Sequence, residues 1–424
     1  MLKLLNEWDP LICADMHVTD GADFEPDVSI QVEPIHQGDS QLYASGTKLR
    51  DELMTKLTAK GSLPLPFYPD LFKTDDPESG FLLTVYGPRF STGYFPARNR
   101  FTVLVETHSW KAYAHRVRVT LNTIVGLIEL IAQHGSNWLA EVTRSDQSDT
   151  RLAGKDVALD YAAGWREPIK SLAKTSANAD DLAAGDQQTT VIDFRGYAYT
   201  RKLSAITGDL VTVYDPSTPQ IWRVPYRKNT APSLVVKAPG AGYVIPVAYT
   251  HDIRPKLELH GIAFELLTAN LRQRNIEAFR ATRAEFSSVP FEGRMRLTLD
   301  GSWKSEQQDI PVGSLFVPIA QHRARLLMAL LEPLATDSFA AWGFFNGCFE
   351  AKEYIEPYVG EMIAKQLLAA DASLAAEFAR KLKEEPEFAR SPTARLEFFH
   401  RRHVSWDERL NLYPIYRLES ALRA

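Results

Sequence analysis

The chain has few cysteines, no long apolar run and only a small excess of one charge. Among its 424 residues only Cys13 and Cys348 are cysteines, so a framework of several disulfide bridges is excluded. Both thiols have apolar neighbours in the sequence, which predicts two buried free cysteines. A small secreted scaffold held together by disulfides is therefore excluded as a class.

Membranes and nucleic acids are also poor matches for this sequence. No apolar run approaches the roughly 20 residues that a membrane-spanning helix needs. The formal net charge of −5 is mild for this length and gives no basic surface for nucleic acid. The first ten residues contain Glu7 and Pro10, unlike a signal peptide. We expect a soluble protein with no nucleic-acid partner and no membrane span, and the sequence leaves its compartment and oligomeric state open.

The composition that remains is that of an ordinary globular protein. Apolar residues make up 45% of the chain, aromatic residues 11% and charged residues 24%. A chain of 424 residues exceeds the usual size of a single core, so we expect two or more domains.

The hydrophobic pattern divides the chain into parts of different character. Residues 1–150 alternate strand and helix patterns, with short apolar runs at 11–17, 81–86 and 101–106 and helical spacing at 41–60 and 112–133. Five apolar residues of the last segment share one helical face: Val117, Leu121, Ile124, Ile128 and Ile131.

The later parts follow other patterns. Residues 151–188 look like a linker, 189–318 read as short strands with one helix near 261–272, and 319–424 return mainly to helical spacing. The predicted fold class is therefore α/β: an α/β domain at 1–150, a linker-like segment, a β-rich domain at 189–318 and a helical C-terminal segment.

Two polar residues close apolar strands in the first part. His17 ends the run at 11–17, and Glu106 ends the run at 101–106. Side chains at the carboxyl ends of strands gather at one edge of an open α/β sheet, where ligands bind. A strand-end carboxylate that is partly desolvated has a raised pKa, which suits a general base. Either residue alone is more often structural, a hydrogen-bonded core histidine or a salt-bridged glutamate.

Longer motifs around these residues resemble a known family. Asp15-Met-His-Val-Thr-Asp-Gly-Ala-Asp23 resembles the late zinc-histidine strand of the zinc metallocarboxypeptidases, more narrowly of a bacterial carboxypeptidase-like branch with a large C-terminal extension. Ser91-Thr-Gly-Tyr94 and residues 98–108 resemble the catalytic-glutamate strand of that branch. Residues 342–346, 349–354 and 411–414 are similar to its extension, so the resemblance covers most of the chain.

The resemblance implies a chemistry and a substrate. His17 would be a zinc ligand, Glu106 the general base and Tyr94 a residue that lines the substrate pocket. Zinc would be the cofactor, and a peptide or an acyl-amino acid the substrate, with hydrolysis of a peptide or related amide bond as the reaction.

The sequence departs from the family at its other zinc ligands. In the family, the other two zinc ligands come from a His-x-x-Glu motif upstream of the late histidine. In this chain, none of the ten histidines has a Glu three residues after it. The Arg and Asn-Arg groups that hold the terminal carboxylate of a peptide are absent as well. Residues 1–150 thus resemble the C-terminal half of a catalytic domain, and we expect the chain to be weakly active or inactive by itself. His108 could join His17 and Glu106 in one cluster, because it lies two residues from Glu106 on the same strand.

Two other readings stay open at this point. The aromatic residues of the β-rich part (Trp222, Tyr226, Tyr243 and Trp303) could present a non-catalytic binding surface to a peptide or glycan. Alternatively, the protein could be a deacylase-type relative that acts on acyl-amino acids. An exposed aromatic groove would favour the binding protein, and burial of the rings would count against it.

Overall fold

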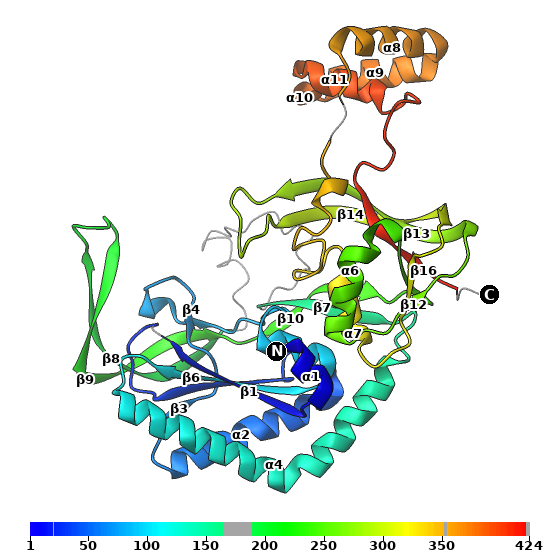
Figure 1. Cartoon of the computed structure of the whole chain (residues 1–424). Coiled ribbons are helices and arrows are strands. Elements are labelled where there is room, and N and C mark those ends of the chain that lie inside the picture. Colours follow the sequence, from blue (N-terminus) through cyan, green and yellow to red (C-terminus); the bar gives the residue numbers. More distant parts are fainter. Residues whose placement is uncertain (20, 164–188, 352–353, 421–424) are drawn as a thin grey trace.

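The computed structural model of the chain describes residues 1–19, 21–163, 189–351 and 354–420. It has an α/β layer near the N-terminus, a β-rich middle and a group of helices that stands apart from both (Figure 1). The predicted fold class, α/β followed by β-rich and helical parts, is confirmed.

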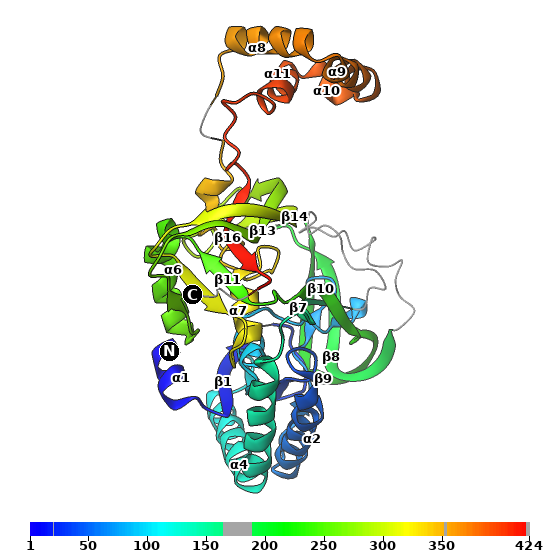
Figure 2. The ribbon, with the colours of Figure 1, turned by 90° about the vertical axis from the view of Figure 1, so that its right-hand side faces the viewer.

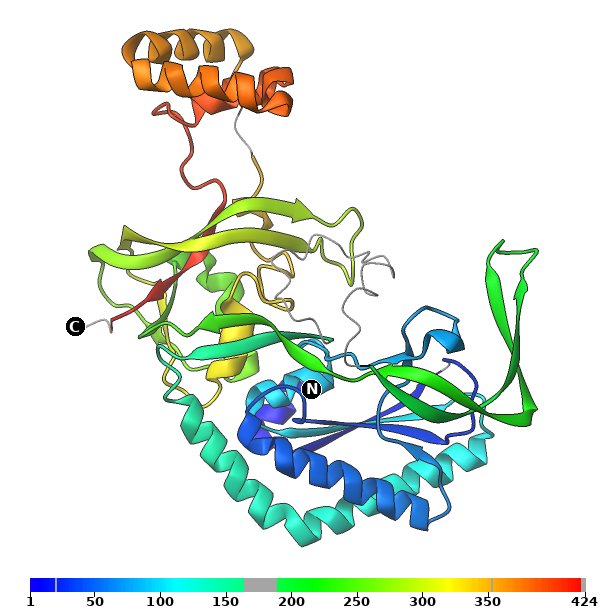
Figure 3. The same ribbon diagram turned by 180° about the vertical axis from the view of Figure 1, so that it is seen from behind.

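A four-stranded mixed sheet organises the first part. Its order is β1 (Ile12–Thr19), β6 (Phe101–His108), β2 (Val28–Glu33) and β3 (Pro64–Leu65). β1 runs parallel to β6, and β2 runs antiparallel to β6. The helices α2 (Tyr43–Ala59) and α4 (Tyr113–Asp149) lie along the same face of this sheet (Figure 3). Val103 and Val105 of β6 and Ile30 of β2 pack against them, so the opposite face is free for polar side chains.

The outer side of α4 carries a second apolar face. Val119, Leu127 and Leu130 are buried against the sheet. The apolar residues that the sequence placed on one helical face are instead exposed; this α4 stripe consists of Val117, Leu121, Ile124, Ile128 and Ile131. Periodicity alone does not tell which of two apolar faces meets the core.

Short elements connect these strands and helices. They are α1 (Leu2–Trp8), η1 (Ser40–Leu42), η2 (Pro77–Ser79), α3 (Ser91–Tyr94) and η3 (Pro96–Arg98). The strand expected at 81–86 is only β5 (Phe81–Leu82), and the residues after it form a loop.

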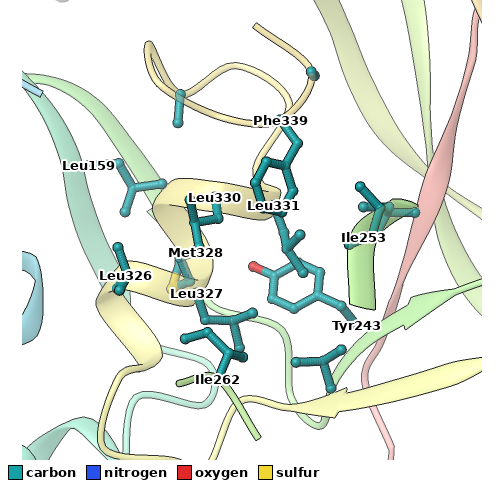
Figure 4. Close-up of a cluster of buried hydrophobic side chains, with 14 of the residues drawn as sticks. Leu159, Tyr243, Ile253, Ile262, Leu326, Leu327, Met328, Leu330, Leu331 and Phe339 are labelled. Atoms are coloured by element: carbon teal, nitrogen blue, oxygen red, sulfur yellow. The ribbon is translucent and has the colours of Figure 1, made fainter. Parts of the chain in front are cut away.

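The β-rich part is built on a six-stranded antiparallel sheet. Its order is β12 (Glu265–Leu266), β15 (Leu315–Pro318), β11 (Gly242–Ile245), β16 (Leu412–Leu418), β13 (Leu271–Phe286) and β14 (Leu297–Ile310). The helices α6 (Val247–His260) and α7 (Ala324–Leu331) complete its core. Figure 4 shows the side chains of α7 packed around Tyr243, which is fully buried. β16 belongs to this sheet although it comes from the segment predicted to be helical, so that prediction was wrong for 412–418.

Two further sheets use long strands. β8 (Thr190–Leu203) and β9 (Leu210–Arg227) form a hairpin that extends away from the body (Figures 1 and 3) and continues into β5 and β4 (Asp70–Leu71). β7 (Asp156–Ala163) pairs with β10 (Thr230–Lys237). β7 lies inside the segment predicted as a linker, so that prediction was wrong there, and 164–188 lie outside the described residues. The helix expected at 261–272 is also wrong, because α6 ends at His260 and β12 follows.

The last helices form a small bundle of their own. They are α8 (Pro357–Ala370), α9 (Ala372–Glu384), α10 (Pro386–Arg390) and α11 (Pro392–His400). Leu374, Phe398 and Phe399 make a core that is separate from the others. The bundle stands away from the sheets in Figures 1 and 2.

Candidate functional site

The sheet brings His17 and Glu106 together. The two residues are direct register partners in the parallel pair of β1 and β6. On the other side of β6, Ser29 of β2 is the register partner of Glu106. All three side chains point to the sheet face opposite α2 and α4, since their neighbours Val105 and Ile30 point into the helical core.

This face has an unusual number of buried polar atoms without a partner. Within the described residues, five such atoms belong to residues that share the face: Ser29 Oγ, Gln31 Oε1, Thr102 Oγ1, Glu106 Oε2 and His108 Nε2. Buried polar atoms are nearly always hydrogen-bonded in folded proteins, and exceptions gather where a ligand, ion or water belongs. The face therefore has the character of a binding site.

Glu106 has the properties of a general base. Burial raises its pKa from 4.5 to about 7, the nearby carboxylate of Asp15 adds to the rise, and His17 opposes it. Its side chain is only 8% exposed. A carboxylate that titrates near neutral pH can take a proton from water and give it up again.

His17 lies at the exposed rim of the same face. Its Nε2 is 2.8 Å from Oδ1 of Asp15, and its side chain is half exposed. A carboxylate that bonds one nitrogen of an imidazole fixes the orientation of the ring, so Asp15 positions His17. The other ring nitrogen, Nδ1, makes no hydrogen bond to a described residue.

Tyr86 is a functional candidate that the sequence reasoning missed. Its phenol lies close enough to Glu106 and Asp70 for their negative charges to act on it, and burial together with these charges raises the pKa of Tyr86 to about 12. The phenol therefore keeps its proton at neutral pH. One signal was present in the sequence, because Tyr86 closes the run at 81–86 as Glu106 closes its own.

Tyr94 lies elsewhere. It is the last residue of α3, which precedes the start of β6, the end opposite Glu106, and its side chain is buried in the core of the β-rich part. Its hydroxyl is 3.0 Å from Nδ1 of His260 in α6 and 3.5 Å from Arg98. The structure therefore does not bring Tyr94 to the sheet face that carries His17 and Glu106.

The described residues do not make a complete zinc site. A hydrolytic zinc ion needs about three protein ligands. No group of three or more His, Cys, Asp or Glu side chains in the described part of the chain could hold a metal ion. His108 is not part of any such group; its ring packs edge-on against Phe24 with 4.5 Å between centroids, and its Nε2 is one of the unpartnered buried atoms of the face. Burial, together with the positive charge of Lys111, lowers the pKa of His108 to about 4.

The aromatic residues of the β-rich part are mostly inside. Trp222 is 4% exposed and Tyr243 is fully buried, while Tyr226 and Trp303 are partly buried. Trp303 lies under the guanidinium of Arg417, which is 4.0 Å from its ring centre. This burial counts against an aromatic binding groove.

Neither Cys13 nor Cys348 is in a disulfide bridge, as expected, but each is only partly buried. Burial and the charge of Asp15 raise the pKa of the Cys13 thiol to about 11. Within the described residues, no helix is both long and apolar enough to cross a bilayer.

Comparison with known proteins yields one distant similarity. Carboxypeptidase 2 of Trichophyton tonsurans and carboxypeptidase 2 of Trichophyton equinum are each 28% identical to this chain over 113 residues. The aligned residues are 27% of this chain and 21% of each relative, so the chain spans about a fifth of the length of these relatives. No family model and no solved structure matches the chain. The similarity indicates a distant carboxypeptidase relationship for about a quarter of the chain.

Proposed function

We propose that the first part of this chain carries part of the active site of a carboxypeptidase-type hydrolase, with Glu106 as its general base. The observation that carries the proposal is the pairing of His17 with a desolvated Glu106 on one polar sheet face. The partial similarity to proteins named carboxypeptidase 2 supports the same reaction class. The substrate class is a peptide or an acyl-amino acid, as the resemblance of the motifs implies.

Glu106 would first accept a proton from water and then donate it to the leaving group. The carboxylate takes a proton from a water molecule while the water oxygen bonds to the carbonyl carbon of the scissile amide. It then gives that proton to the amide nitrogen as the carbon–nitrogen bond breaks, which leaves a carboxylic acid and an amine.

His17 is proposed as one donor to the zinc ion that the resemblance implies. The described residues do not supply enough ligands for such a site, so the proposed reaction steps involve only Glu106 and water. For the same reason we expect this chain to be weakly active or inactive by itself.

The proposal is tested by measuring the pKa of Glu106 and the hydrolysis of amides on the same samples. NMR of the side-chain carboxyl groups, assigned with Glu106→Gln, should give a pKa near 7 for Glu106. Hydrolysis of an N-acyl dipeptide and an N-acyl amino acid, with zinc added, should stay close to the buffer rate. Any excess should disappear in Glu106→Gln and persist in the control Glu265→Gln, which changes an exposed residue of β12.

Two results would contradict the proposal. One is a Glu106 pKa near 4.5, the value of an ordinary glutamate. The other is hydrolysis above background that Glu106→Gln leaves unchanged.

A further inference from the structure

A cavity of about 260 Å³ lies where the first part of the chain meets the β-rich part. Its walls come from the loops at residues 37 and 85–87, from β7, β10 and β14, and from the segment after α7. β7 and β10 lie between the α/β layer and the six-stranded sheet (Figure 3). Sites for drug-sized molecules measure about 300–1,000 Å³, so this junction cavity has room for a group the size of an amino-acid side chain.

The lining of the junction cavity combines apolar side chains with carboxylates. Asp160 of β7 and Asp300 of β14 both reach it. The charge of Asp300 is already matched, because its Oδ2 accepts a hydrogen bond from Nε of Arg283 at 2.7 Å. The apolar part of the wall is contributed by Val85, Leu159, Ala162, Leu234, Leu299 and Leu334.

Asp160 has no cation partner within the described part of the chain. Its Oδ2 accepts a hydrogen bond from the backbone N–H of Thr336 at 3.0 Å, and no described lysine, arginine or histidine acts on its charge. The charged side chain that does act on it, Asp337, has the same sign. Carboxylates that are withdrawn from water are usually paired with a cation, as Asp149 is with Arg325. Asp160 therefore leaves a place for a positive charge at the cavity.

Asp160 is charged at neutral pH in spite of its burial. Burial raises its pKa from 3.8 to about 6, the hydrogen bonds from Thr336 oppose the rise, and the like charge of Asp337 adds to it. Most molecules therefore carry the ionised carboxylate at pH 7.5.

An organic cation fits this cavity better than a metal ion. A bound metal ion needs several converging ligands, and no group of three His, Cys, Asp or Glu side chains in the described residues could hold one. Lysine and arginine side chains combine an apolar stem with a charged end. Leu159 and Leu234 offer apolar contacts for such a stem, and Tyr86 and Tyr161 line the same cavity with aromatic rings, which attract cations.

We propose that the junction cavity binds the ammonium or guanidinium group of a basic side chain, with Asp160 as its counter-ion. The alkyl stem lies along the apolar part of the wall, and the charged end donates a hydrogen bond to the carboxylate. The same head group occurs on residues of a peptide and on free alkylamines and alkylguanidines. The inference does not rest on the proposed hydrolase function, because neither His17 nor Glu106 lines the cavity.

The test is the binding of small basic probes to the full chain at pH 7.5, measured by ligand-observed NMR titration. Nα-acetyl-arginine amide should bind at least about tenfold more tightly than Nα-acetyl-citrulline amide, which has nearly the same shape without the charge. Asp160→Asn keeps an acceptor for Thr336 and should weaken binding of the arginine probe at least about tenfold. The control Asp209→Asn changes an exposed carboxylate between β8 and β9 and should leave the affinity unchanged.

A second variant tests the location without removing a charge. Ser233 of β10 lines the cavity, so Ser233→Leu should fill part of it and weaken binding of the arginine probe. This variant keeps the test decisive if Asp160→Asn does not fold.

n-Propylguanidine, the arginine side chain without its backbone, separates the two sources of the ligand. Tighter binding of the acetylated amide assigns a residue of a peptide, and equal or tighter binding of n-propylguanidine assigns a free alkylguanidine. Three results would overturn the proposal: no binding of the arginine probe at millimolar concentration, equal binding of the citrulline probe, or binding that neither Asp160→Asn nor Ser233→Leu weakens.

Discussion

For Glu106, the charged form that the proposed general base needs is the form that destabilises the folded state. Folding raises its pKa from 4.5 to about 7, so the folded state favours the protonated carboxyl. The stabilising effect of that proton is complete below about pH 4.5 and is lost as the pH rises through 7. A shift of this size corresponds to at most about 3 kcal/mol of unfolding free energy, less where water reaches the site.

Glu106→Gln should therefore stabilise the protein in alkaline solution. A neutral amide has no charge to desolvate, so we expect a gain of about 1–3 kcal/mol at pH 8 and little change at pH 4.5. Urea unfolding at the two pH values measures the difference. The control Glu265→Gln, on the surface of β12, should change the free energy of unfolding little at either pH. An equal gain for Glu265→Gln would contradict the burial of the Glu106 carboxylate. So would a gain for Glu106→Gln that is largest at pH 4.5.

The sequence predicts the placement of some candidate residues well and that of others poorly. His17 and Glu106 close apolar strands, and the register of a parallel pair then brings them together. Tyr94 illustrates the limit, because its motif says nothing about which way α3 turns its side chain. Tyr86 lies in a loop, and loop geometry has no period that a sequence pattern can reveal.

At the level of elements, the end of α4 joins the first part of the chain to the β-rich core. Asp149, the last residue of α4, is fully buried and accepts hydrogen bonds from Asn99 and from Arg325 of α7. Burial raises the pKa of Asp149 to about 7, and Arg325 opposes the rise. The ion pair therefore holds a carboxylate in a place that water does not reach.

Removal of Arg325 should be costly and dependent on pH. Arg325→Ala leaves the buried carboxylate without its cation, so we expect a loss of about 3 kcal/mol at pH 8. At pH 5 the loss should be smaller, because Asp149 can then bind a proton. Thermal unfolding at both values measures it, with Arg380→Ala as a control that breaks an exposed pair on α9. Equal effects of the two variants would contradict the account.

Elements with local patterns could be predicted, whereas those set by distant pairing could not. Helix spacing located α2 and the start of α4, and apolar runs located β1 and β6. The sequence split β8 and β9 into shorter strands, because turn-like residues such as Pro216-Ser217-Thr218 lie inside β9. It also missed β16, whose partners β11 and β13 come from more than a hundred residues earlier.

At the scale of the whole molecule, the described residues bring several unpartnered polar atoms to one sheet face. His17 stands at the rim beside the open edge of β1, and within the described residues no group of three His, Cys, Asp or Glu side chains could hold a metal ion. The chain also spans only about a fifth of the length of the carboxypeptidases it resembles in part. A single imidazole beside one carboxylate binds zinc weakly, because affinity depends on several converging ligands.

Zinc titration of the full chain tests this account most directly. Calorimetry at pH 7.5 on the wild type and on His17→Ala, with His403→Ala as a surface control, measures affinity and stoichiometry together. The account predicts one weak site, no tighter than the high-micromolar range, that His17→Ala removes and His403→Ala keeps. Nanomolar binding, or binding that His17→Ala leaves unchanged, would contradict it.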